Sequence, residues 1–427
     1  MANLKVKDGS GADIFTLAQG SGTNDDPYIP VLVNQLDTDG AAGDAFGRIR
    51  VSNPETIYSQ KFLYSKSDST FFSEELNGAA TSVLDASNSC IDMGVTNSGD
   101  FAIRQSRQRI NYQAGKSQLY KMTGILNPEA GTEKRIGCFQ GGTSSPFNVL
   151  DGICFESDGT DMYAKIYKAG TESDSAIQSS WLDPLDGSGP SGITIDWSKT
   201  QIFIIDYQWL GVGRVRFGLG IDGVTYYVHE FNHANIKDQV YMRSPNQPVR
   251  YEIRSTGGTG TMKQICCAVD SEGGQSPSGL TASVRSTSSI SVGSSSYELI
   301  KAIRLKPDQL DATVILDKVN TIAISSGDYE YVICWNPIIA GTENWVDVTG
   351  AAIQEWDGDG STNNVTPLII MDGGFNSSDT DAKTTLINST LRLGSAIDGE
   401  QDVIALAVKT ESGTDTFKGS MTLRQLI

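Results

Sequence analysis

Apolar and polar residues alternate most regularly between positions 214 and 229. Apolar side chains occupy every second position from 215 to 221 and again from 224 to 228. A two-residue period is typical of a half-buried strand. Asp222-Gly223 separates the two runs, and an Asp-Gly pair between alternating segments is a strong turn signal. This stretch therefore predicts a β-hairpin.

Short apolar segments separated by polar turns continue over most of the chain. QIFIIDYQWL (201–210) has the length and character of an inner strand, and YEYVICW (329–335) places its aromatic residues on one face. No segment from residue 280 onward requires a long helix. Many short strands at this spacing are typical of sandwiches or barrels. The pattern predicts an all-β fold with two β-sandwich domains, of the jelly-roll or lectin-like kind.

Changes in composition divide the chain into four parts. Residues 1–60 are rich in turn formers and predict an extended docking arm. Residues 61–270 predict the first β-sandwich. Glycine, serine and proline replace the apolar periodicity in 271–279, which indicates a linker. Residues 280–427 predict the second β-sandwich.

The net charge of −18 restricts the partners. A negative surface opposes binding to phosphate backbones and anionic membranes, so we expect neither a nucleic-acid partner nor membrane insertion. The six cysteines show no CxxC spacing, and the N-terminus has no apolar signal region. We therefore expect reduced thiols and assembly in a cytoplasm.

The strongest local match to a metal motif is His229-Glu230-Phe231-Asn232-His233, which has the H-E-x-x-H form of zinc proteases. In a helix the two histidines would lie about 6 Å apart on one face. In a strand they would lie about 13 Å apart and could not share one ion. Because the motif ends an alternating run, a strand end is the favoured interpretation. A zinc site at His229 and His233 is the weaker alternative.

Two acidic turns, 37–40 and 357–360, place alternate aspartates before a glycine. Such turns resemble halves of calcium loops, but neither has the distal glutamate of an EF-hand. Ordinary Asp/Gly turns are favoured, and Ca²⁺ is a weaker alternative.

No residue set predicts catalysis. The sequence contains neither a GxSxG elbow nor a GxxxxGK[ST] loop, and no carboxylate pair stands out. We therefore expect no enzyme activity. Tryptophans near predicted turns, Trp181 and Trp209 among them, are candidates for stacking on sugar rings, although tryptophan is more often part of a core.

Two segments near the N-terminus, GSGTNDDPYIPV and DAFGRIRVSNP (44–54), resemble a family of structural proteins in tailed, mostly marine, bacteriophages. The similarity continues through 106–124 and 197–235. The resemblance implies a virion protein with a β-rich body, assembled in the bacterial host cytoplasm. It implies no position in the particle and no catalytic residue.

Together these features predict a virion appendage or decoration subunit, on the capsid, neck or tail. It would be a homo-oligomer, with a trimer expected first. In this interpretation the arm contacts other virion proteins, because an apolar anchor and two cations suit attachment to a neighbouring subunit. The alternative is that these residues form a strand of the first domain. The candidate contact residues are Asp44, Phe46, Gly47, Arg48 and Arg50.

Two other classes of protein remain open. The first domain could be a carbohydrate-binding module for host adhesion, with a host-surface glycan as partner, as in tail fibres or spikes. A non-viral surface-layer or adhesion protein is disfavoured by the missing signal peptide.

Overall fold

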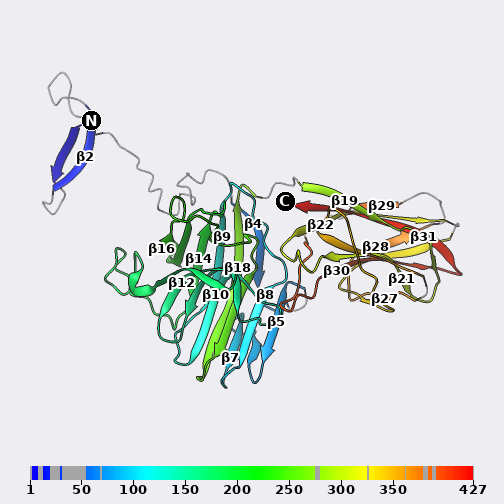
Figure 1. Cartoon of the computed structure of the whole chain (residues 1–427), viewed down its shortest axis with the longest axis horizontal. Coiled ribbons are helices and arrows are strands. Elements are labelled where there is room, and N and C mark those ends of the chain that lie inside the picture. Colours follow the sequence, from blue (N-terminus) through cyan, green and yellow to red (C-terminus); the bar gives the residue numbers. More distant parts are fainter. Residues whose placement is uncertain are drawn as a thin grey trace.

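The chain consists almost entirely of β-strands (Figure 1). The computed structural model describes residues 2–7, 13–19, 29–30, 54–67, 70–274, 279–324, 327–360, 362–377, 383–386 and 391–426. Within these ranges the only helical element is the 3-10 helix η1 (Gln178–Ser180). No helix in this part of the chain is long and apolar enough to cross a membrane. The predicted all-β fold class is confirmed.

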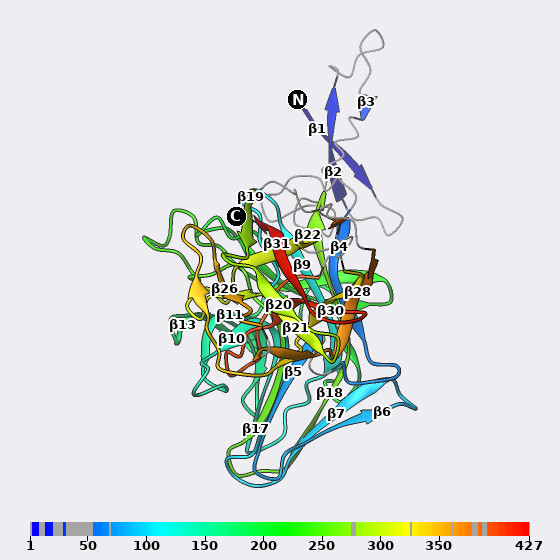
Figure 2. The ribbon, with the colours of Figure 1, turned by 90° about the vertical axis from the view of Figure 1, so that its right-hand side faces the viewer.

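Two antiparallel sheets form the first sandwich. The seven-stranded sheet has the order β13 (Thr171–Ile177), β12 (Met162–Lys168), β11 (Val149–Ser157), β10 (Thr132–Gly141), β17 (Val249–Ser255), β8 (Phe101–Ser106) and β5 (Phe72–Asn77). The eight-stranded sheet has the order β16 (Val224–Phe231), β15 (Val215–Ile221), β14 (Gln201–Tyr207), β9 (Gln118–Ile125), β18 (Gly260–Glu272), β7 (Cys90–Val95) and β6 (Thr81–Asp85), with β4 (Pro54–Lys61) also paired to β18. Figure 2 shows β17 in one layer and β18 with β7 in the other.

The core of this sandwich lies between the two sheets. The Phe155 ring lies 5.2 Å from the ring of Phe203 and 5.2 Å from that of Phe217, centroid to centroid. Ile136 and Ile153 face the same core. Because side chains alternate across a strand, the residues between these positions point to the outer face of the seven-stranded sheet.

The predicted hairpin is present in the eight-stranded sheet. Strands β15 and β16 pair antiparallel, with Ile221 opposite Val224. The turn residues Asp222 and Gly223 both have positive φ, at 51° and 79°. Two successive residues with positive φ are typical of the type I′ turn that the Asp-Gly pair favours.

The second sandwich also has two sheets. The smaller contains β19 (Gly279–Arg285), β31 (Asp415–Leu426), β22 (Thr313–Ala323) and β29 (Lys383–Leu386), with β20 (Ile290–Val292) paired to β31. The larger contains β24 (Ile338–Ile339), β27 (Asn364–Thr366), β21 (Tyr297–Leu305), β30 (Val403–Thr410), β23 (Tyr329–Trp335) and β28 (Ile369–Asn376), with β26 (Ile353–Asp357) paired to β21 and to β25 (Val346–Asp347).

Strand β23 shows how the second core is built. Tyr329, Ile333 and Trp335 pack into the cluster between the two sheets, as the aromatic pattern of the segment predicts. The intervening Val332 and Cys334 pack into a smaller cluster on the opposite face. Both faces of this strand are therefore buried.

The N-terminal strands form a separate small sheet. β1 (Ala2–Lys7) pairs antiparallel with β2 (Asp13–Gln19), and β2 with β3 (Ile29–Pro30). The predicted arm extended to residue 60, but β4 begins at Pro54 and belongs to the first sandwich. The arm prediction is wrong for this last stretch, because Ile57 and Tyr58 of β4 are adjacent and the segment shows no apolar alternation. The five candidate contact residues, Asp44 to Arg50, lie outside the described residues.

Residues 391–402, here called the interdomain segment, belong to the second sandwich and contact the first. They precede β30 of the second sandwich and lie against the end of β8 in the first, so the two bodies sit side by side (Figure 1). The Ser395 amide donates to the Arg107 carbonyl at 2.9 Å. Ile397 packs with Ile103 and Phe147. This contact fixes where the second sandwich sits beside the first.

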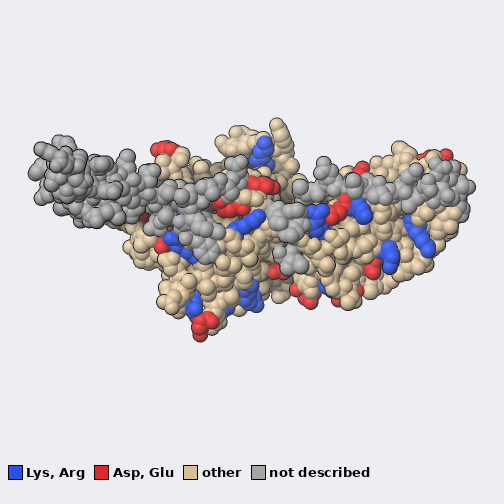
Figure 3. Space-filling view, turned by 90° about the horizontal axis from the view of Figure 1, so that it is seen from above, with Lys and Arg blue, Asp and Glu red and all other residues tan. Residues whose placement is uncertain are grey.

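Positive and negative side chains are interspersed on the face seen in Figure 3, without a large area of one sign. Five of the six cysteines are buried, Cys266 is half-buried, and all six are free thiols. Burial raises the pKa of Cys334 to about 12, so this thiol stays protonated at neutral pH.

Candidate functional site

The outer face of the seven-stranded sheet carries charged residues in direct cross-strand register. Arg135 of β10 lies opposite Glu156 of β11 on one side and opposite Glu252 of β17 on the other. Lys165 of β12 lies beside Glu156. Directly opposed side chains on one face are close enough to interact. We call Arg135, Glu156, Lys165, Arg250 and Glu252 the charge ladder.

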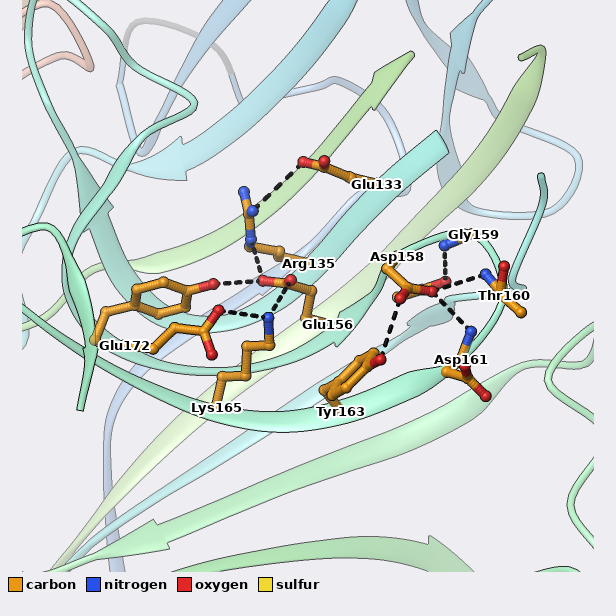
Figure 4. Close-up of polar contacts among 12 residues, drawn as sticks. Glu133, Arg135, Glu156, Asp158, Gly159, Thr160, Asp161, Tyr163, Lys165 and Glu172 are labelled. Atoms are coloured by element: carbon orange, nitrogen blue, oxygen red, sulfur yellow. Dashed lines mark hydrogen bonds and ion pairs between the residues drawn. The ribbon is translucent and has the colours of Figure 1, made fainter. Parts of the chain in front are cut away.

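Each carboxylate of the charge ladder has cationic partners, and Figure 4 shows those of Glu156. Arg135 Nε donates to Glu156 Oε2 at 2.5 Å, and Arg135 Nη1 donates to Glu252 Oε1 at 2.6 Å. Lys165 Nζ donates to Glu156 at 2.8 Å, and Arg250 Nε donates to Glu252 at 2.7 Å. Burial alone would raise the pKa of Glu156, but the charges of Arg135 and Lys165 hold it below its usual range.

The charge ladder is largely covered. The Arg135 guanidinium lies 4.7 Å from the ring centroid of Phe147, and the Tyr167 hydroxyl donates to Glu156 at 2.8 Å. Glu252 is fully buried. A glycosidase acid requires a carboxyl group with a raised pKa that can reach a ligand. Glu156, with its lowered pKa, does not meet this requirement, and the fully buried Glu252 cannot reach a ligand. Both carboxylates pair with cations of the sheet face.

An open pocket of about 460 Å³ lies beside the ladder, where the second sandwich meets the same sheet face. This size is in the range of small-molecule sites. The first sandwich contributes its floor from the ends of β8, β10 and β11, and the second sandwich contributes a wall from residues 307–311 and Ile397. We call it the interdomain pocket; the lining residues that matter most are Arg109, Gln140, Thr143, Leu150, Asp308 and Leu310.

Hydrogen bonds across the junction give the pocket its shape. Arg107 Nε donates to Asp402 Oδ1 at 2.7 Å, and both side chains are buried. The Ser244 hydroxyl donates to Asp311 Oδ2 at 2.6 Å, and Asn246 Nδ2 donates to the Asp311 carbonyl at 2.9 Å. These hydrogen bonds hold the second sandwich against the first beside the pocket.

Arg109 is the buried cation of the pocket, with 7% of its surface exposed. Its Nη1 donates to Ser395 Oγ at 2.6 Å and its Nε to Gln140 Oε1 at 3.3 Å. Among the described residues no carboxylate lies within ion-pair distance of it. Burial lowers the pKa of the Arg109 guanidinium to about 10, and the more distant Asp311 carboxylate only partly offsets this effect.

A second hollow, of about 540 Å³, lies on the other side of Ile397. Glu75, Asp398 and Glu400 line it, so we call it the acidic hollow. Burial raises the pKa of Glu75, and the negative charge of Asp398 adds to this effect. The interdomain segment thus separates a pocket with a buried cation from a hollow with an excess of carboxylates.

The two tryptophans proposed for sugar stacking are packed inside the first sandwich. Trp181 is buried, and its Nε1 donates to the Ala176 carbonyl at 3.0 Å. Trp209 is half-buried, and its Nε1 donates to the Met242 carbonyl at 2.9 Å. The carbohydrate-stacking prediction is wrong for Trp181, because no ligand can reach the face of a buried ring. It stays a prediction for the half-buried Trp209.

The HEFNH motif lies at the end of β16, so the two histidines do not share a helical face. The His233 ring is buried, with Nδ1 2.7 Å from the Gly213 carbonyl and Nε2 3.3 Å from Asp174 Oδ2. Burial lowers the pKa of His229, which lies edge-on to Phe231. The structure therefore does not bring His229 and His233 together as zinc ligands, as the weaker alternative required.

The acidic turn at 357–360 does not converge on a cation site. Thr287 Oγ1 donates to Asp357 at 3.0 Å, and Thr362 Oγ1 donates to Asp359. The turn at 37–40 lies outside the described residues. Among those described, three potential ligand atoms meet only at Asp85, Cys90 and Asp92, where Lys263 already pairs with Asp92 at 2.5 Å.

The pocket residues were missed at the sequence level. Arg109 follows Arg104 and Arg107 in the segment 104–109, which shows no alternation that would mark these arginines as buried. Leu310 and Asp308 belong to a polar turn some two hundred residues away in the chain. The only sequence feature that points to the pocket is the cluster of three arginines. If such guanidinium groups are buried, they need partners from other parts of the fold.

Comparisons with known proteins match solved structures only. No family model and no curated protein matches the chain. The Bacillus licheniformis beta-glucanase matches 49% of this chain and 97% of its own, at 11% identity and a TM-score of 0.34. The carbohydrate recognition domain of Emp47p matches 51% of this chain and 96% of its own, at 8% identity and a TM-score of 0.33. A lectin from Bauhinia forficata in complex with GalNAc matches 52% of this chain and 100% of its own, at 11% identity and a TM-score of 0.30. Values this low carry no argument about ligand or activity.

Proposed function

We propose that this chain is a non-catalytic carbohydrate-binding protein whose ligand occupies the interdomain pocket. The observation that carries the proposal is the lining of this pocket, which combines apolar side chains with hydrogen-bonding ones. Leu150, Leu310 and Ile397 provide apolar wall, while Arg109, Thr143 and Asp308 provide donors and acceptors on the same volume. A sugar ring presents C–H surface and hydroxyl groups together, so it matches such a mixed lining.

The absence of catalysis is part of the proposal. The carboxylates that the sheet face offers next to the pocket are paired with Arg135, Lys165 and Arg250. A pair of carboxyl groups for glycoside hydrolysis must differ in protonation, with one held as the acid. The low pKa of Glu156 is the opposite of what that role requires.

A glycan array probed with the full chain, followed by titration calorimetry of each hit, tests the binding proposal. Thr143→Trp fills the pocket from an exposed loop and should lower the affinity at least tenfold. Thr160→Trp is the matched control, because Thr160 is also exposed in a loop but lies outside the pocket. Equal affinities of the two variants and the unchanged chain would reject the pocket as the site.

The setting of this binding is the second part of the proposal, a phage particle in which the chain serves as an adhesion or decoration subunit. The support is the resemblance of residues 44–54 to phage structural proteins. Deletion of residues 1–53 tests it without removing β4, which pairs with β18 in the first sandwich. If the truncated protein enters particles at the level of the full chain, the docking arm is disproved.

The expected homo-oligomer, with a trimer first, remains a prediction. Light scattering on the purified chain measures it directly. A mass equal to one chain at micromolar concentration would contradict the oligomer and leave the binding proposal unaffected.

A further inference from the structure

The buried Arg109 has no carboxylate within ion-pair distance among the described residues. Arg107, Arg135 and Arg250, all buried as well, each have a carboxylate within 2.7 Å. Arg109 has two neutral acceptors, Ser395 Oγ and Gln140 Oε1. Burying a charge without a counter-charge is unfavourable. Arg109 is therefore a cation that an external anion would stabilise.

The charges around Arg109 determine where an anion would sit. Arg243 lines the same pocket, but its guanidinium is paired with Asp151, Nε to Oδ2 at 2.9 Å. Asp308 is exposed, so water screens its carboxylate. Asp311 accepts the Ser244 hydroxyl at the opposite wall. The pocket is thus positive at Arg109, on its floor, and negative at its outer wall.

We infer that the ligand of the interdomain pocket is an acidic sugar, a hexuronic-acid unit or a chemically equivalent glycan carboxylate, whose carboxylate pairs with Arg109. This inference rests on the proposed carbohydrate-binding function and specifies its ligand class. A planar guanidinium matches a carboxylate in a charge-assisted, bidentate geometry. The sugar hydroxyls would donate to Asp308 and Asp311.

The polarity of the pocket excludes simpler ligands. A free inorganic anion would satisfy Arg109 but leave the apolar wall of Leu150 and Leu310 and the acceptors of Asp308 without a partner. A neutral sugar would fit the wall and the acceptors but leave Arg109 unpaired. Only a ligand with both a carboxylate and neutral hydroxyl groups matches the floor and the wall together.

The test compares two tetrasaccharides that differ only in the carboxyl group. One is α-1,4-linked oligogalacturonate, and the other is the same oligosaccharide after reduction of its carboxyl groups to hydroxymethyl groups. Titration calorimetry with the full chain at fixed ionic strength should show at least tenfold tighter binding of the acidic form. Acetate at the same concentration is included as a probe of simple anion binding.

Variants assign the preference to Arg109. Arg109→Gln should remove the difference between the two tetrasaccharides, and Arg109→Lys should retain part of it. Glu75→Gln is the matched control, because it changes one charge on the other side of Ile397, in the acidic hollow. Should Arg109→Gln fold poorly, Thr143→Trp blocks the same pocket without touching the guanidinium, and it should weaken the acidic form at least tenfold.

Each outcome separates this inference from the proposed function. If the reduced tetrasaccharide, or only neutral glycans on the array, bind as well as the acidic ones, the acidic-sugar inference is overturned and carbohydrate binding stands. If acetate competes fully at equal concentration, the site binds an anion without recognising a sugar, and the inference is also overturned. Absence of any glycan binding overturns both.

Discussion

Arg107 and Asp402 are 295 positions apart in the sequence, and their side chains meet at 2.7 Å in the junction between the two sandwiches. Asp402 also accepts from Asn336 Nδ2 at 2.8 Å and from the Gly394 amide at 3.1 Å. The pair therefore joins the end of β8 in the first sandwich to two separate segments of the second. It holds the interdomain segment in the position that forms one wall of the pocket.

Removal of one partner of this pair should destabilise the junction. Arg107→Ala leaves the buried Asp402 carboxylate without its cation, which for a buried pair costs about 3 to 5 kcal/mol. Urea denaturation followed by tryptophan fluorescence, together with limited proteolysis between the sandwiches, measures the loss. Lys121→Ala removes a pair in which the lysine is 43% exposed, and that loss should stay below about 1 kcal/mol. Equal losses in the two variants would contradict a special role for the junction pair.

Asp402 and Glu156 should give opposite dependences of stability on pH. Burial raises the pKa of Asp402 in the folded chain. Its contribution to the free energy of unfolding is therefore full below the unfolded value of 3.8 and falls as pH rises through the folded pKa. The pKa of Glu156 is lowered despite its burial, so its contribution is present above 4.5 and is lost as pH falls through the folded pKa.

Denaturation curves of the unchanged chain, Asp402→Asn and Glu156→Gln between pH 3 and 7 test these signs. The stability of the unchanged chain relative to Asp402→Asn should decrease with rising pH, and relative to Glu156→Gln it should increase. Two slopes of the same sign would show that one of the two carboxyl groups is in a different electrostatic environment from the one described.

Trp181→Ala should affect folding rather than ligand recognition. The Trp181 ring packs edge-on against Phe155 and Trp197 at centroid distances of 6.0 and 6.4 Å. Truncation of a buried tryptophan costs about 3 to 5 kcal/mol. Thermal melting and glycan affinity should be measured on the same sample. A variant with unchanged melting temperature and lost affinity would restore this residue as a sugar-binding platform.

Metal removal should leave the chain unchanged. His233 is engaged by Gly213 and Asp174, and the carboxylates of the 357–360 turn accept from threonine hydroxyls. A metal that binds the folded state raises its melting temperature in proportion to the logarithm of its concentration. We therefore expect equal melting temperatures with EDTA and with added Ca²⁺ or Zn²⁺. A shift of several degrees, or stoichiometric zinc by elemental analysis, would reopen the metal alternatives.

Sequence patterns predict the local parts of this fold well and its long-range parts poorly. The hairpin across Asp222-Gly223 and the buried face of YEYVICW follow from alternation and turn chemistry, which act over a few residues. Arg104 shows the opposite case, because it is fully buried in the first sandwich, where its Nη1 donates to Glu74 and its Nε to Gln264 at 2.6 Å each. Alternation alone would have placed this charge at the surface.

The candidate site escaped the sequence for the same reason. Arg109 and Ser395 are 286 positions apart, and neither lies in a recognisable motif. The tryptophans were chosen instead because an aromatic ring near a turn suits a sugar, but the sequence does not show whether such a ring faces solvent or the core. Recognition of the pocket required the relative position of two domains, which no local pattern encodes.

The order of synthesis gives the interdomain segment a further role. Asp402 leaves the ribosome 295 positions after Arg107, which at about 5 to 20 residues per second corresponds to a delay of about 15 to 60 s. During this interval the first sandwich can fold before the second sandwich has supplied the pocket wall that faces Arg107 and Arg109. Chains that stop before the interdomain segment would therefore carry a folded first sandwich without the pocket. Ligand binding would report that synthesis has passed the interdomain segment.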